Sequence, residues 1–271
     1  MTRRWEHGFT DVDAQPDPAA WIAVLDEVRR EPLYAAYKRR ALELLDPEAG
    51  GRYLDVGAGT GADALACAKR FGVEVVGADS SRVMVEEATR RGLTEAVLAD
   101  AHSLPFPAES FDGAWADRTF QHLADPVTAL GEMVRVVKPG GRIVVVDPDY
   151  ATQVVDVPDQ ELAERVLRFR AVHGVRNGTM AHQMGRLFVR AGLADVKVEA
   201  APIVLRDPKA LDNALGLRDW ASLAHELRLV RADEVAVWEK AIDDAGADGC
   251  FLYSFSLFVT AGRKREGMVA S

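Results

Sequence analysis

The residues best suited to chemistry stand in a glycine-rich turn and at two aspartates further along the chain. The run Asp55-Val56-Gly57-Ala58-Gly59-Thr60-Gly61 follows an apolar stretch and precedes a helical pattern. Glycines at such a turn let the backbone approach a ligand closely. Asp79 and Asp100 follow the next two strand-like runs, where a carboxylate could accept from ribose hydroxyls and from an adenine amino group respectively. The pattern predicts a site for a nucleotide-like ligand.

The charge of Asp55 separates two possible ligands. Gly57, Gly59 and Ala62 also satisfy the dinucleotide pattern G-x-G-x-x-G/A, and Asp79 lies at a suitable distance to bind a ribose. Asp55, two residues before the first glycine, would repel a pyrophosphate but attract the ammonium group of a methionine moiety. The sequence therefore favours S-adenosylmethionine (SAM) over NAD.

Structural roles for the same residues stay open alongside the binding roles. Asp55 could cap the following helix, because carboxylates suit a helix N-terminus whatever the ligand. Asp79 and Ser80 could cap the helix that begins near Arg82, and Met84 could be a core residue.

The elements that must position these residues alternate between strand and helix. Nearly unbroken apolar runs such as VEVVGA and RIVVVD are typical of parallel strands covered on both faces. The strands are predicted at residues 52–56, 73–78, 95–98, 111–116, 142–146, 196–205 and 250–260. The helices are predicted at residues 18–29, 32–45, 62–71, 82–91, 127–136, 158–173, 183–191, 208–215, 217–229 and 232–245. This is an α/β chain with a doubly wound sheet, whose last strand is expected to run antiparallel to its neighbour.

Four motifs in order, DVGAGTG, GADSS, LADAHSLPFPAESFD and EMVRVVKPGG, resemble those of class I SAM-dependent methyltransferases. The group with the ubiquinone and menaquinone biosynthesis enzymes and many small-molecule methyltransferases is the most similar, over about residues 52–149. The resemblance implies a seven-stranded sheet of order 3-2-1-4-5-7-6 with the seventh strand antiparallel. It also implies that Gly57, Ala58 and Gly59 line the methionine part, Asp79 the ribose, and Asp100 with Ala101 the adenine. The candidate SAM-binding residues are Asp55, Gly57, Ala58, Gly59, Asp79, Ser80, Met84, Asp100, Ala101 and Arg118.

We expect one methyltransferase domain with helical additions. Residues 1–50 would form an N-terminal helical cap, residues 51–150 the SAM-binding core, and residues 151–182 and 206–249 two lid insertions. Lids that exclude water suit an enclosed acceptor site of modest size. Apolar and aromatic residues of the lids favour a small, largely apolar acceptor with an oxygen or nitrogen nucleophile, and less so a carbon nucleophile.

Candidate acceptor-side residues are aromatic side chains and histidines. His122, after the fourth strand, is the candidate general base, because an imidazole can accept a proton near neutral pH; packing beside the cofactor is the alternative. Tyr34 and Tyr37, with Trp5, lie on the N-terminal segment, which could close over SAM. The candidate substrate-binding residues are Tyr34, Tyr37, Tyr150, His173 and His182.

Composition limits the partners and the compartment. The net charge of -9 and the scattered basic residues argue against a nucleic-acid substrate. No apolar run is long enough for a membrane span or a signal peptide, and no metal is expected. The two cysteines, Cys67 and Cys250, form no disulfide framework, so we expect core thiols in a protein of the reducing cytoplasm. The oligomeric state, monomer or homodimer, stays open.

The sequence pattern is compatible with three functions. A small-molecule methyltransferase explains Asp55, Asp79 and Asp100 together. A protein that binds SAM but catalyses another reaction, such as a cyclisation, or only binds, would use the same residues. A nicotinamide oxidoreductase is the least favoured.

Overall fold

The computed structural model describes residues 9, 11–30 and 32–267 of the 271-residue chain. One seven-stranded sheet runs through the molecule, in the order β3-β2-β1-β4-β5-β7-β6. Its strands are β1 (Arg52–Val56), β2 (Glu74–Asp79), β3 (Glu95–Leu98), β4 (Phe111–Asp117), β5 (Val137–Val155), β6 (Ala194–Leu205) and β7 (Tyr253–Arg263). Strands β1 to β5 pair in parallel, and β7 pairs antiparallel with both β5 and β6. The predicted fold class and strand order are confirmed.

Side chains along each central strand alternate between the two faces of the sheet, as strand geometry requires. Tyr53 of β1 belongs to one apolar cluster and its neighbour Leu54 to the other. Trp115 of β4 likewise packs on the opposite face from Ala114 and Ala116. Both faces are therefore buried, which is why these strands read as continuous apolar runs.

Different helices cover the two faces. Helices α2 (Pro32–Leu45) and α3 (Ala62–Phe71) contribute to the first cluster, and α5 (Pro126–Val136) and α7 (Met184–Arg190) to the second. Helix α1 (Ala20–Arg30) packs against α2, and α4 (Arg82–Arg90) packs against β2 and β3.

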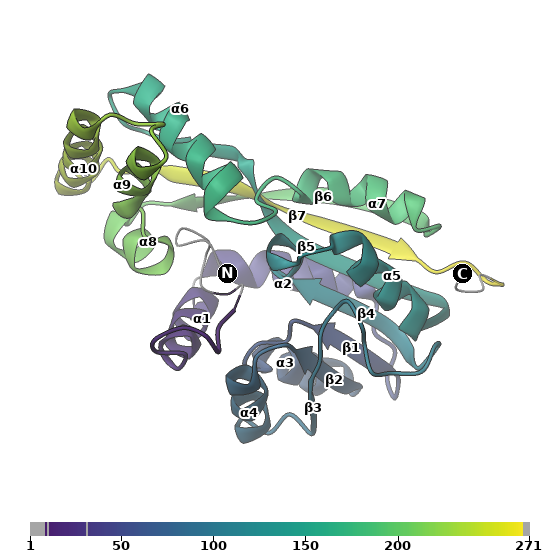
Figure 1. Cartoon of the computed structure of the whole chain (residues 1–271). Coiled ribbons are helices and arrows are strands. Elements are labelled where there is room, and N and C mark those ends of the chain that lie inside the picture. Colours follow the sequence, from purple (N-terminus) through teal and green to yellow (C-terminus); the bar gives the residue numbers. More distant parts are fainter. Residues whose placement is uncertain (1–8, 10, 31, 268–271) are drawn as a thin grey trace.

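The remaining helices form a separate group at one end of the sheet (Figure 1). They are α6 (Gln160–Phe169), α8 (Pro208–Leu215), α9 (Asp219–Glu226) and α10 (Ala232–Ala247). Figure 1 shows them around the far ends of β5, β6 and β7, away from α5 and α7. A π-helical turn, residues Arg170–Gly174, continues α6. This helical group, which we call the lid, encloses one side of the cavity described below.

Two details differ from the sequence prediction. Strand β5 does not end at Val146 but continues to Val155, because Val154 and Val155 resume pairing with β7 after an irregularity that follows Asp149. Cys67 is buried as expected, whereas Cys250 is exposed. The expectation of a core thiol at Cys250 was wrong because α10 ends in a turn at Gly249, with φ +66°, and β7 begins only at Tyr253.

Candidate active site

A cavity of about 510 Å³ opens at the carboxyl ends of β1, β2 and β4 and extends to the lid. This edge of a doubly wound sheet is where such folds bind ligands. One part of the wall is the glycine turn with acidic residues around it: Asp55, Gly57, Ala58, Gly59, Asp63, Asp79, Met84 and Asp117. The other part is largely apolar: Tyr150, Val204, Leu205, Leu211, Leu215, Phe255 and Leu257, with Arg170 among them.

The glycine turn needs its glycines for two reasons. Gly57, Gly59 and Gly61 have φ values of +74°, +53° and +72°, in the left-handed region that other residues avoid. A Cβ atom on Gly57 would also lie 2.2 Å from Oγ1 of Thr119. The backbone N–H groups of Gly57 and Ala58 donate to the Ala78 carbonyl at 2.7 and 3.1 Å, so the turn folds over the end of β2.

Asp79 closes this turn from the end of β2. Its Oδ2 accepts from the Gly59 N–H at 2.7 Å, and its Oδ1 accepts from the Ser81 N–H at 2.9 Å. Burial raises the pKa of its carboxyl, although the hydrogen bonds oppose that shift. The side chain that caps α4 is that of Ser81, which accepts from the Met84 N–H. Ser80 is exposed and lies outside the described cavity wall, whereas Met84 is buried in it.

Asp13, from the N-terminal segment, completes the cap of α4. Its carboxylate accepts from the Ser81 hydroxyl and from the Arg82 N–H, the latter at 2.8 Å. Ser81 and Asp13 thus cap the first turn of α4, while Asp79 accepts from the N–H of the N-cap residue Ser81 and from Gly59 of the glycine turn.

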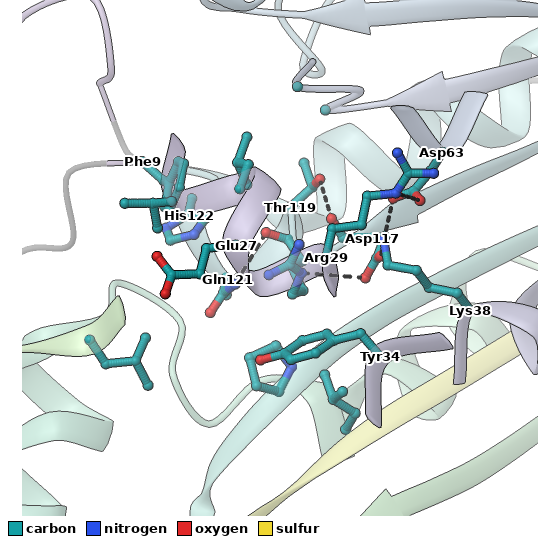
Figure 2. A pocket seen from close by; sticks show the side chains of 18 of the residues that line it. Phe9, Glu27, Arg29, Tyr34, Lys38, Asp63, Asp117, Thr119, Gln121 and His122 are labelled. Atoms are coloured by element: carbon teal, nitrogen blue, oxygen red, sulfur yellow. Dashed lines mark hydrogen bonds and ion pairs between the residues drawn. The ribbon is translucent and has the colours of Figure 1, made fainter. Parts of the chain in front are cut away.

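Four aspartates gather in the part of the wall around the glycine turn, so this part is rich in acidic groups. Asp55 is only 3% exposed, and burial together with the neighbouring Asp63 raises the pKa of its carboxyl well above the usual range. Lys38 of α2 extends between Asp63 and Asp117 and forms an ion pair with each, at 2.7 Å to Asp117 (Figure 2). Burial lowers the pKa of Lys38, but Asp117 and Asp63 more than offset this and raise it.

This acidic wall fits SAM better than a dinucleotide. A pyrophosphate would stand beside Asp55, whose pKa burial and the neighbouring Asp63 already raise, whereas a cationic ammonium and sulfonium would relieve that repulsion. Among described residues, no three His, Cys, Asp or Glu side chains form a metal site. No described helix has the length and apolar character needed to cross a bilayer.

Asp100 and Ala101 lie outside the described cavity wall. The exposed Asp100 carboxylate accepts from the His102 N–H at 2.9 Å and contacts the His102 ring, which in turn accepts from the Asp125 N–H at 3.0 Å. The adenine-binding role of Asp100 and Ala101 stays a prediction.

Arg118 and His122 lie between the two parts of the wall. The Arg118 guanidinium stacks over the Tyr34 ring, 5.3 Å from its centroid. Figure 2 shows His122 beside Phe9, and the two ring centroids are 6.2 Å apart. Burial and the nearby cations, Arg170 first among them, lower the pKa of His122 to about 3, so its imidazole is neutral at neutral pH.

The predicted acceptor-side residues divide into two groups. Tyr34 and Tyr150 line the cavity. Tyr37 is buried beneath it and donates its hydroxyl proton to Asp117 at 3.1 Å. His173 stacks on Phe169 and His182 contacts Asp149, both outside the described wall. Trp5 lies outside the described residues.

Sequence reasoning missed several charged residues of the wall, among them Lys38, Asp63 and Arg170. Arg170 left a signal in the sequence. It falls on the same helical stripe as the buried Leu162, Val166 and Phe169, where an arginine is out of place unless it serves a site.

Comparison with known proteins identifies the core. Residues 54–145 match the family model described as a methyltransferase domain. An uncharacterized 37.1 kDa protein of a Streptomyces fradiae transposon is 39% identical over 203 residues, which cover 73% of this chain and 59% of that protein. Demethylmenaquinone methyltransferase of Thermus thermophilus is 44% identical over 117 residues, 41% of this chain and 53% of that enzyme. The chain thus spans between half and two thirds of these relatives.

Among solved structures, the [4+2]-cyclase SpnF superposes with a TM-score of 0.54 at 25% identity, covering 86% of this chain and 82% of that one. The likeness in fold to this structure therefore extends beyond the matched core, residues 54–145.

Proposed function

We propose that this chain, which carries a class I SAM-dependent methyltransferase domain, transfers the methyl group of SAM to an oxygen or nitrogen atom of a small, largely apolar molecule. The observation that carries the proposal is the single cavity that joins the acidic glycine turn to the apolar wall under the lid. A donor and an acceptor could share this space, as a displacement between them requires.

The donor would be held at the glycine turn. Asp55 would attract the ammonium group, the backbone of Gly57 to Gly59 would pack against the methionine part, and Asp79 would accept from the ribose hydroxyls. Asp79 would exchange its bond from Gly59 for these hydroxyl donors. When bound, SAM supplies an electrophilic methyl carbon on a positively charged sulfur.

The chain's own residues would contribute mainly alignment and a dry cavity. Helix α1 covers the glycine turn, and the apolar wall keeps water from the acceptor. His122 would remove a proton only where the nucleophile carries one, and its low pKa makes it a weak base. We therefore assign His122 chiefly to packing and orientation of the two ligands.

A small acceptor is favoured over a nucleic acid by the net charge of -9 and by the enclosed site. No residue of the wall identifies a particular metabolite, and a cytoplasmic location follows from the sequence argument alone.

The test uses the whole protein and methyl-labelled SAM with fractionated small molecules. We expect label in a small-molecule product together with an equal amount of S-adenosylhomocysteine, and much less of both with the Asp79→Ala variant at the same SAM concentration. SAM that binds but stays intact in the presence of all fractions would contradict the proposal.

A second candidate is a reaction that uses the same fold without methyl transfer. The likeness to a [4+2]-cyclase favours it, because that protein matches over most of this chain. A product of unchanged mass, formed while SAM remains intact, would support this candidate instead.

A further inference from the structure

Arg170 is a buried cation in the wall of the cavity. It is 3% exposed and begins the π-helical turn after α6. Turns of this kind are frequent at functional sites, because they shift one side chain out of the regular helical pattern. An arginine keeps its charge when buried, so a counter-ion or full hydrogen bonding is required.

The guanidinium lacks that compensation. Nη1 donates to the Gly174 carbonyl at 3.0 Å, but Nε and Nη2 have no hydrogen-bond partner among the described residues. No ion pair joins Arg170 to a described carboxylate. Arg118, the other arginine with an unpartnered Nε in this wall, does have a carboxylate nearby, 3.8 Å away on Asp117.

Two aromatic rings hold the guanidinium in place. Its central carbon lies 4.7 Å from the centroid of the Tyr150 ring and 5.4 Å from that of Trp220. The indole N–H of Trp220 donates to the Leu215 carbonyl at 2.9 Å, which fixes that ring. Rings stabilise a cation but leave its N–H donors unsatisfied and its charge uncompensated.

The two unpartnered nitrogens form one edge of the guanidinium. The N–H bonds of Nε and of Nη2 run parallel along this edge, which matches the two oxygens of a carboxylate. The surrounding wall is largely apolar, with Phe255 and Leu257 of β7 close to Tyr150 in the sheet. Asp207 also lines the cavity, but its carboxylate accepts from the N–H groups of Lys209 and Ala210 at the start of α8. A ligand with one carboxylate on an apolar body would complement both features.

We propose that Arg170 binds a carboxylate of the methyl acceptor, so that the substrate class is a small, apolar carboxylic acid. This inference rests on the proposed function only in naming the ligand as the acceptor. The pairing of Arg170 with a carboxylate can be tested without methyl transfer.

The binding experiment compares acids with their uncharged amides. Calorimetric titrations of the whole protein loaded with S-adenosylhomocysteine would use benzoate against benzamide and 2-naphthoate against 2-naphthamide. We expect at least one acid to bind about tenfold or more tightly than its amide, as a charge-assisted bidentate pair requires. Arg170→Gln should abolish this preference, and Arg168→Gln, an exposed arginine on the same helix, should retain it.

Stability and donor binding provide independent readouts. Arg170→Met, which removes a buried unpaired charge but keeps the side-chain volume, should raise Tm in the absence of ligand. A purely structural arginine would lower Tm when replaced. Affinity for S-adenosylhomocysteine should be unchanged in Arg170→Gln.

Three results would overturn the proposal. Acids could bind no better than their amides, including the case in which neither binds. The preference could survive in Arg170→Gln. The affinity for S-adenosylhomocysteine could fall in Arg170→Gln, which would mean that Arg170 binds the donor's own carboxylate. None of these results bears on whether methyl transfer occurs, which the labelled-SAM experiment decides separately.

Discussion

At the scale of single residues, the cavity wall combines carboxylates around the glycine turn with His122, whose lowered pKa keeps its imidazole neutral at neutral pH. The sequence already indicated Asp55 and Asp79, since Asp55 is the penultimate residue of β1 and Asp79 the last residue of β2, and both strands are apolar runs. It could not indicate Lys38 or Asp63, because their position in the wall depends on how α2 and α3 dock on the sheet.

Asp55 should destabilise the free protein at neutral pH. Its carboxyl has a raised pKa in the folded state, so the folded state holds its proton more tightly than the unfolded chain does. Stability is therefore lost as pH rises above the ordinary range of this carboxyl. We expect Asp55→Asn to have a higher Tm than the parent near pH 7, with a gap that narrows toward pH 4, and to bind S-adenosylhomocysteine more weakly. A Tm gap that does not change with pH would contradict this assignment.

His122 has the opposite linkage. Its pKa falls from 6.5 to about 3 on folding, so stability is full above about pH 6.5 and is lost as pH falls below it. Between pH 7 and pH 5 the free energy of unfolding of His122→Gln should therefore fall by about 1–2 kcal/mol less than that of the parent, as measured by denaturant unfolding. If methyl transfer is observed, its kcat/KM profile should show no His122-dependent inflection between pH 6 and 7. Such an inflection, lost in His122→Gln, would restore the general-base role.

At the scale of elements, the glycine turn and helix α1 together form the donor side. The sequence predicted both the turn and the helix after it, because glycine placement and apolar period are local signals. The π-helical turn at Arg170 and the irregularity in β5 after Asp149 were not predictable, since the turn packs against β5 and the irregularity lies in the pairing of β5 with β7, and both contacts form only in the folded chain.

Gly57→Ala separates backbone strain from steric contact. Both Gly57 and Gly140 have left-handed φ values, +74° and +81°, but only Gly57 has a close neighbour, Thr119. Alanine at either position should cost about 1–2 kcal/mol of folding free energy. Gly57→Ala should cost more and should also reduce S-adenosylhomocysteine affinity, as seen in paired unfolding and binding titrations. Equal effects of the two substitutions would refute the close approach to Thr119.

Arg91 ties α1 to the donor side. Arg90 and Arg91 both bind Glu87, but only Arg91 also reaches Asp26 of α1, with two bonds at 2.7 and 2.9 Å. We expect Arg91→Ala to speed release of S-adenosylhomocysteine in stopped-flow measurements, because the cover over the glycine turn loosens. Arg90→Ala serves as the matched control and should leave release unchanged. The same rate in both variants would show that α1 does not retain the ligand.

At the scale of the whole molecule, the doubly wound sheet and its burial on both faces followed from the alternating pattern and the apolar runs, whereas the strand order followed from the resemblance of four motifs to class I methyltransferases. The enclosure of the apolar part of the cavity could not be predicted from the sequence, since it arises where α6, α8 and α9 pack around the ends of β5, β6 and β7 (Figure 1). The acidic donor side and the apolar acceptor side become one site only in the folded chain.

SAM binding in this cavity is tested by a calorimetric titration of the whole protein with S-adenosylhomocysteine, with Asp79→Ala and NADH as comparisons. We expect one ligand per chain, an affinity loss of about ten- to hundredfold in Asp79→Ala from the missing charge-assisted bonds, and no binding of NADH. Tighter binding of NADH than of S-adenosylhomocysteine, or an unchanged affinity of Asp79→Ala for S-adenosylhomocysteine, would contradict the binding of SAM in this cavity.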